Sequence, residues 1–164
     1  MQRVTLLCVG KLKERFYIEA AAEYVKRLSR FCKLEILELP EERLPENPSP
    51  AQIDAALLKE AEAVRRKIPP SSRLVALCVE GRLRSSEDLA RTMAAWAAGA
   101  EGGLEKRLVF LIGGSFGLHA SLKAEAWDRL SMSPMTFPHH LARVMLLEQI
   151  YRAYQINGGT RYHK

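Results

Sequence analysis

The sequence predicts one α/β domain built on a doubly wound, mainly parallel sheet. Its 164 residues suit a single domain of common size with one substantial core. Apolar, β-rich runs alternate with segments of helical periodicity along the whole chain, and this alternation is typical of parallel sheets. No repeat, low-complexity segment or interdomain linker interrupts the pattern, so we treat residues 1–164 as one domain.

The chain begins with a strand, a helix and a second strand. Residues 3–9 form an apolar, β-rich run. Residues 14–29 form a predicted amphipathic helix, because apolar side chains recur at every fourth position: Phe16, Ala20, Tyr24 and Leu28. Residues 33–39 alternate apolar with acidic side chains and form the second predicted strand, and residues 40–50 are a proline-rich connection.

A clear start signal opens the next helix. Ser49 suits the N-cap, Pro50 suits the first helical position, and Gln52 follows three residues after the cap. Pro69 and Pro70 end this helix. Its predicted apolar stripe consists of Ile53, Leu57, Ala61 and Val64.

The same cycle continues to the end of the chain. The predicted elements are a strand at 73–79, a helix from Ser85 or Ser86 to 98, a turn at 99–103, a strand at 108–112, a short helix at 122–126, a short strand at 129–132 and a long helix at 138–156.

The last helix is apolar on more than one side. Its apolar residues leave a narrow polar stripe: Leu141, Val144, Met145, Leu146, Leu147, Ile150, Tyr151 and Tyr154. Such a helix is usually buried on two sides. Because it comes last on the sheet, a second copy of the chain can supply the other covering surface through a two-fold contact. We therefore expect a homodimer.

Composition argues against membrane, secreted and metal-binding proteins. Apolar residues make up 48% of the chain, but no unbroken apolar run approaches the ~18 residues of a membrane span. The first apolar stretch runs straight into Lys11 and Lys13 without a cleavage site, as a strand does and a signal peptide does not. The three cysteines and four histidines lack metal-ligand spacing. We expect no metal, no membrane partner and a reducing cytoplasm.

The charge favours a polyanionic partner. The formal net charge is +6, and each phosphate that a basic side chain neutralises releases counterions and strengthens binding. Nucleic acid is the natural partner. A solvated basic surface without a partner is the alternative, because the basic residues are scattered over most of the chain.

A glycine loop is the sharpest local feature. Residues 113–117, Gly-Gly-Ser-Phe-Gly, directly follow a predicted strand, where glycines let a ligand approach the backbone closely. The loop lacks the GxGxxG pattern of dinucleotide folds and the Gly-Lys-Ser/Thr of phosphate loops. It is either a ligand-binding loop or a tight turn.

Two more connections offer groups for an adenosine-like ligand. Residues 131–138 join the last short strand to the last helix and carry hydroxyls, apolar side chains and free backbone groups. The alternative is a simple helix lead-in with Thr136 near the cap and Pro138 in the first turn. The other connection is 77–81, where a strand ends in Glu80-Gly81.

Two groups of polar residues lie near or after the last helix. His139 and Arg143 are four residues apart and share one face near its start, although a plain helix-start histidine and an exposed arginine explain the spacing too. Arg152 follows Glu148 at the spacing of a helical ion pair. The tail at 158–164 places an aromatic residue and basic residues after two glycines, which suits RNA or a frayed terminus.

Together these segments resemble the RlmH family of small bacterial SPOUT methyltransferases along the whole chain. The resemblance is carried by Ile112-Gly113-Gly114-Ser115-Phe116-Gly117-Leu118, Met135-Thr136-Phe137-Pro138-His139, Arg143, Glu148-Gln149-Ile150-Tyr151-Arg152-Ala153 and Tyr162-His163-Lys164.

The resemblance implies a C-terminal trefoil knot, a homodimer whose two copies shape each active site, and methylation of N3 of a pseudouridine in 23S rRNA within the ribosome. It also implies that S-adenosyl-L-methionine (SAM) sits in the knot as methyl donor. The cofactor-binding residues would be Leu77, Gly113, Met132, Ser133, Pro134, Met135, Thr136 and Phe137.

Methylation of this nitrogen also removes its proton, which a general base, water or bulk solvent can take up. We expect His139 or His163 to act as that base. Arg143, Arg152 and Lys164 would anchor phosphate or stabilise a deprotonated nucleobase, and Tyr162 would stack on a base. Two alternatives are a noncatalytic RNA-binding or ribosome-associated dimer, and a nucleotide-phosphate enzyme, which the missing loop lysine disfavours.

Overall fold

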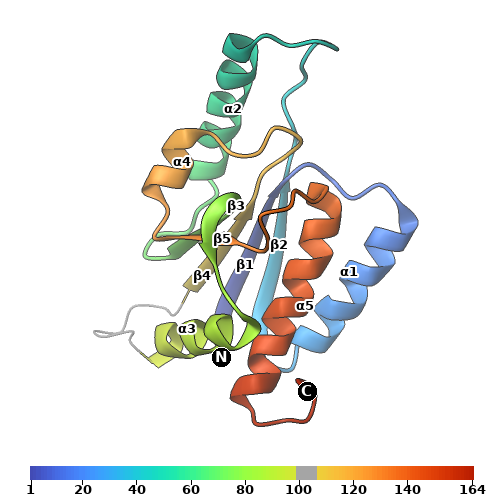
Figure 1. The fold of residues 1–164 in the computed structure, drawn as a ribbon, viewed down its shortest axis with the longest axis vertical. Coiled ribbons are helices and arrows are strands. Elements are labelled where there is room, and N and C mark those ends of the chain that lie inside the picture. The colour runs from blue at the N-terminus through green and yellow to red at the C-terminus, as the bar shows by residue number, and fades with distance from the viewer. Residues whose placement is uncertain (99–106) are drawn as a thin grey trace.

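The structure, a computed structural model, describes residues 1–98 and 107–164, and the turn expected at 99–103 lies outside them. Its centre is a five-stranded, all-parallel sheet in the order β2-β1-β4-β3-β5 (Figure 1). The strands are β1 (Gln2–Val9), β2 (Cys32–Leu39), β3 (Arg73–Leu83), β4 (Arg107–Ile112) and β5 (Asp128–Ser131). The parallel pairing confirms the predicted fold class.

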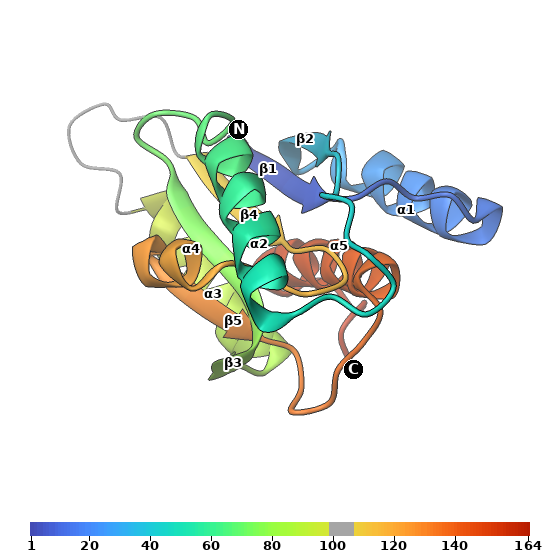
Figure 2. The same ribbon diagram turned by 90° about the horizontal axis from the view of Figure 1, so that it is seen from above.

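Helices cover both faces of this sheet (Figure 2). They are α1 (Arg15–Leu28), α2 (Pro50–Arg65), α3 (Ser86–Ala98), α4 (Ala120–Glu125) and α5 (His139–Asn157). One buried cluster joins the sheet to α1, α3 and α5, and a second cluster joins it to α2 and α4. The domain is therefore doubly wound, as the alternation of strands and helices predicts.

The strand β1 shows why the apolar runs of this sequence are continuous. Val4, Leu6 and Cys8 belong to the cluster under α1, α3 and α5, whereas Leu7 and Val9 belong to the cluster under α2 and α4. Successive side chains of a strand point to opposite faces, and here both faces are covered.

The start of α2 is as predicted, but its buried face is not. Ser49 Oγ accepts a hydrogen bond from the Gln52 amide, and the Gln52 side chain accepts one from the Ser49 amide, which completes a capping box. The buried residues are Ala56, Glu60, Ala61 and Val64, while Ile53 and Leu57 are only half-buried. Glu60 turns inward because its carboxylate accepts a hydrogen bond from the Glu42 amide at 2.9 Å.

The strand β3 is longer than predicted and irregular. It continues to Leu83, beyond the expected end at Val79, and its pairing with β5 shifts between Leu77 and Arg82. A Cβ at Gly81 would lie 2.8 Å from backbone of Leu130, so this glycine permits a close approach of the two strands. The polar residues and the glycine of this stretch are not typical of a strand, so the sequence did not predict that the strand continues.

The helix α5 lies against α1 on one side and α3 on the other. The rings of Tyr24 and Tyr151 are 6.3 Å apart across α1 and α5. Asn157 donates to the Ala90 carbonyl of α3 at 2.9 Å, and Ile150 is fully buried over the sheet. Helices of the same chain thus supply part of the second covering surface, and the homodimer stays a prediction.

Candidate active site

A pocket of about 740 Å³ opens at the carboxyl end of β4, beside residues 77–80 of β3 and the loop after β5. Ligands of open α/β sheets bind at this edge. The three loops singled out in the sequence meet here, together with the start of α5. The expected cofactor-binding residues that line the pocket are Leu77, Gly113, Met132, Ser133, Met135, Thr136 and Phe137. Pro134 belongs to the same loop but is not among the lining residues.

The turn after β4 depends on glycine. A Cβ at Gly113 would lie 2.4 Å from the carbonyl oxygen of Gly117, and Gly117 has a φ of +78°. The Gly117 amide donates to the Gly114 carbonyl at 3.1 Å and closes the turn. The loop is therefore a tight turn that also forms a wall of the pocket, and its role as a ligand-binding loop stays a prediction.

Glu41 is a residue of this region that the sequence did not reveal. Its carboxylate accepts a hydrogen bond from the Ser115 amide at 2.6 Å, and a Cβ at Gly114 would lie 2.6 Å from the same carboxylate. Glu41 belongs to the connection 40–50, whose sequence has no distinctive pattern. The contact fastens that connection to the glycine loop.

The irregular part of β3 forms the wall opposite the glycine loop. Residues 77–80 line the pocket where the pairing with β5 is interrupted. The carboxylate of Glu80 forms an ion pair with Lys123 of α4, and this hydrogen bond holds the pKa of Glu80 below its usual value. The pair adds no net charge to the pocket.

Hydroxyl groups shape the loop between β5 and α5. Ser131 Oγ donates to the Ser133 carbonyl at 3.0 Å, and the Met135 amide donates to Ser133 Oγ at 3.0 Å. Met135 lines the pocket yet is 72% exposed, so it offers apolar surface to a ligand. Pro138 occupies the N-cap position of α5, one residue earlier than the first-turn position expected for it.

His139 is the polar side chain best placed for chemistry. It begins α5 and lines the pocket. Burial lowers the pKa of His139, and the electrostatic interaction with neighbouring His140 lowers it further. A histidine with a lowered pKa is neutral near pH 7 and can accept a proton.

Arg143 lies one helical turn beyond His139, as its spacing predicts, but it does not face the pocket. Its side chain is 3% exposed, and Nη1 donates to Glu38 Oε2 at 2.6 Å. Nη2 donates to the Gly10 carbonyl at 2.9 Å. Within this chain Arg143 therefore fastens α5 to the ends of β1 and β2, and the expected contact of Arg143 with substrate stays a prediction that its burial does not support.

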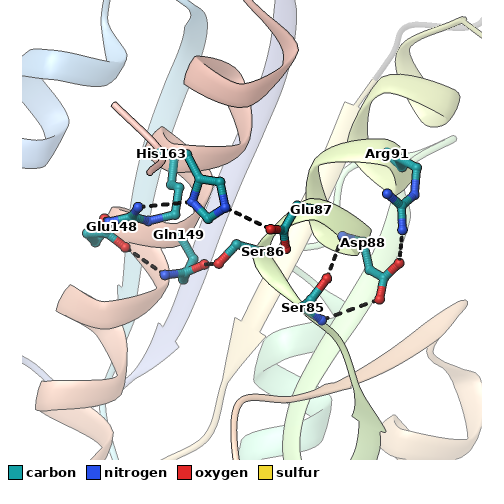
Figure 3. Close-up of polar contacts among 9 residues, drawn as sticks. Ser85, Ser86, Glu87, Asp88, Arg91, Glu148, Gln149 and His163 are labelled. Atoms are coloured by element: carbon teal, nitrogen blue, oxygen red, sulfur yellow. Dashed lines mark hydrogen bonds and ion pairs between the residues drawn. The ribbon is translucent and has the colours of Figure 1, made fainter. Parts of the chain in front are cut away.

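The C-terminal tail folds back on α5. Figure 3 shows His163 directed toward Glu87 at the start of α3, with 2.8 Å between His163 Nε2 and Glu87 Oε1. Arg152 forms the ion pair with Glu148 that its spacing predicts, at 2.6 Å, and its guanidinium lies 4.8 Å from the centre of the Tyr162 ring. Arg152 Nη1 also lies 3.2 Å from His163 Nδ1.

This docking separates the two candidate bases within one chain. Arg152, which holds His163, lies ~20 Å along α5 from His139, because a helix rises about 1.5 Å per residue. Tyr162 lies against the same part of α5 as His163, and Lys164 is exposed at the chain end. In a single chain, the tail thus lies away from the pocket that His139 lines.

Within 1–98 and 107–164, no three histidine, cysteine, aspartate or glutamate side chains gather as a metal-ligand set. Cys8 and Cys32 are buried free thiols, and Cys78 is a half-buried one. No helix in these two ranges combines the length and the apolar character needed to cross a membrane.

Comparison with known proteins assigns the family. The family described as "Predicted SPOUT methyltransferase" matches residues 2–163. A protein of Clostridioides difficile (strain 630) named ribosomal RNA large subunit methyltransferase H is 45% identical over 161 residues, which cover 98% of this chain and 99% of the relative. The all-parallel sheet agrees with this family, and a C-terminal trefoil knot fits it. The chain therefore belongs to the SPOUT methyltransferase family and is a homologue of the RlmH enzymes.

Proposed function

We propose that this chain methylates N3 of a pseudouridine in 23S rRNA, on assembled ribosomes in the cytoplasm, with SAM as methyl donor. The observation that carries the proposal is the end-to-end similarity, at 45% identity, to a relative named as a large-subunit rRNA methyltransferase. The net charge of +6 suits an RNA substrate. A domain of 164 residues has little surface for recognising RNA sequence alone, which favours a substrate presented in folded form by the ribosome.

The pocket at the carboxyl edge of the sheet fits SAM in size and in chemistry. Its volume of about 740 Å³ is in the range of pockets for ligands of this size. Backbone at Gly117 can approach a ligand closely, because Gly117 lines the pocket and a Cβ there would meet no protein atom within 4 Å. Phe116 and Met135, both largely exposed at the pocket, offer apolar contacts to an adenine or a thioether chain. Leu77, Gly113 and residues 132–137 are the residues we assign to hold it.

When bound, SAM supplies a methyl group on a sulfonium, which a nitrogen nucleophile displaces in line. The chain's own task is to hold the acceptor nitrogen in line, to exclude water and to take up the proton of N3. His139 is suited to the last part because it lines the pocket and its pKa is lowered by burial. We therefore assign the proton-accepting role to His139 and propose that Arg152, Tyr162 and Lys164 contact RNA.

We also propose that the enzyme works as a homodimer. A second pocket of about 510 Å³ lies beside α5, and Leu89, Leu130 and Met132 form part of its apolar lining. Val144 and Met145 of α5 are half-buried there within one chain. A second copy seated on α5 would cover this surface, and both copies would then shape each active site. His163 remains a candidate base in this arrangement.

The function is tested by transfer of labelled methyl groups. Ribosomes from cells that lack this methyltransferase are incubated with labelled SAM and the purified protein, with free rRNA in parallel. We expect label in the 23S rRNA of intact ribosomes and much less label in free rRNA. SAM binding without transfer to either substrate would contradict the assigned target. Absence of SAM binding would favour a noncatalytic RNA-binding dimer.

A further inference from the structure

The segment that follows β1 carries cations beside the pocket without belonging to its lining. Lys11 and Lys13 are both exposed. Within 1–98 and 107–164, neither lysine is paired with a carboxylate at ion-pair distance. Arg15, by contrast, is engaged by Glu19 at 2.6 Å. Neither side chain is thus committed to a direct ion pair, although Lys11 interacts electrostatically with Glu38 beyond that distance.

The position of this segment relative to the active site is fixed by Arg143. Glu38, held by Arg143, accepts a hydrogen bond from the Leu12 amide at 3.2 Å. Arg143 also binds the Gly10 carbonyl. A Cβ at Gly10 would lie 3.0 Å from Cε1 of His139, so the backbone before the lysines touches the proposed base. The lysines are thus anchored next to His139.

Aromatic rings connect the surface of this segment to the pocket. Phe16 is 63% exposed, and its ring centre lies 4.4 Å from that of Tyr17. The ring of Tyr17 lies 6.1 Å from His140, and the ring of His140 lies 3.9 Å from His139. The four rings form a continuous path from solvent to a residue that lines the pocket.

We propose that residues 11–17 bind the substrate RNA next to its target nucleotide, with Lys11 and Lys13 on backbone phosphates and Phe16 stacked on a neighbouring base. This inference rests on the proposed function. Exposed aromatic rings beside basic side chains are the combination that binds unpaired RNA, because rings stack on any base while cations meet the phosphates. The target nucleotide would then enter the pocket at His139.

The test measures affinity for ribosomes that lack the modification. Fluorescently labelled protein is titrated with these ribosomes at several salt concentrations. For the double variant Lys11→Ala/Lys13→Ala, we expect the slope of log affinity against log salt to flatten by about 1.4, since each contact to a single strand contributes about 0.7. The matched control, Lys59→Ala/Lys67→Ala, removes two exposed lysines of α2 and the turn after it and should leave the slope unchanged.

Phe16 is tested by keeping or removing its ring. Phe16→Leu keeps an apolar side chain without a ring, and we expect ribosome affinity to fall by about tenfold. Phe16→Trp should restore it. SAM affinity and the thermal unfolding temperature should stay unchanged in all these variants, which separates a lost RNA contact from a damaged fold.

Three outcomes would overturn the inference. The first is wild-type affinity and salt slope in the lysine double variant. The second is equal weakening by the control pair, which would indicate only general electrostatic attraction. The third is a change in oligomeric state of Phe16→Leu, which would show that a second copy covers this ring. Failure of the proposed function itself would appear differently, as wild-type protein that binds ribosomes but transfers no methyl group.

Discussion

Replacing Arg143 with methionine separates a structural role of this arginine from a chemical one. Methionine has a similar length and suits a buried site, but it cannot donate hydrogen bonds. The variant loses the bond from Nη1 to Glu38 at 2.6 Å and the bond from Nη2 to the Gly10 carbonyl at 2.9 Å. It leaves the lining of the pocket unchanged, because Arg143 is not part of it.

The expected loss of stability follows from these contacts. Removing one partner of a buried ion pair costs about 3–5 kcal/mol. The Glu38 side chain is 33% exposed, so water compensates part of the loss and we expect the lower end, about 3 kcal/mol. For a domain of this size each kcal/mol lowers Tm by about 2–4 °C, which gives a decrease of about 6–12 °C.

The same pair gives stability a dependence on acid pH. Burial alone would raise the pKa of Glu38, but hydrogen bonds from Arg143 and the Leu12 amide outweigh it and hold the pKa below the usual 4.5. The folded-state pKa is thus below the unfolded value. The stabilisation is therefore present above about pH 4.5 and is lost as the pH falls through the lowered pKa. Arg143→Met should flatten this acid loss.

Calorimetric melting of Arg143→Met, Glu38→Gln and the double variant measures the coupling, and labelled methyl transfer well below Tm measures activity. We expect the losses of stability in the two single variants to add up to more than the loss in the double variant. The affinity for SAM should be retained in all three. A variant of wild-type stability whose kcat falls by more than about a hundredfold would refute a purely structural role, because the loss of a structural contact lowers stability together with activity.

Three further predictions concern the pocket. Gly113→Ala places a Cβ 2.4 Å from the Gly117 carbonyl oxygen, so we expect the Kd for SAM, measured by titration calorimetry, to rise at least tenfold. The control is Gly158→Ala, whose Cβ would lie 3.3 Å from its nearest neighbour and which should bind SAM with the wild-type Kd. If His139 is the base, kcat of the wild type falls as the pH drops through the lowered pKa of His139, and His139→Gln should abolish this fall. A pH profile that the substitution leaves unchanged would exclude His139 as the base. Glu41→Ala removes the acceptor for a glycine-loop amide and should weaken SAM binding several-fold, whereas Glu41→Gln, which keeps an acceptor oxygen, should bind better than the alanine variant.

The sequence predicted elements whose signals are local. The capping box at Ser49 and Gln52 marks the start of α2 because each of its hydrogen bonds spans only three residues. The glycines of the loop after β4 mark a close approach of backbone because no other residue fits there. The alternation of strands and helices predicted the sheet because parallel strands require crossover connections.

Features that depend on distant partners were missed. Glu41 meets the glycine loop across 74 positions in sequence, and nothing near it announces the contact. Arg143 is separated from its partner Glu38 by 105 positions, so its burial could not be told from exposure by helical spacing. Glu60 faces inward for the same reason, since its partner is an amide of the preceding connection. The docking of His163 on Glu87 is likewise a contact between distant segments.

The central claim is tested most directly by identifying the methylated nucleoside. Ribosomes from cells lacking this methyltransferase are incubated with SAM and either the wild type or Gly113→Ala, and nucleosides of the 23S rRNA are analysed by mass spectrometry. The account predicts N3-methylpseudouridine with the wild type and little or none with the variant. A methyl group on any other nucleoside would contradict the assigned substrate, and equal product with Gly113→Ala would contradict the assigned pocket.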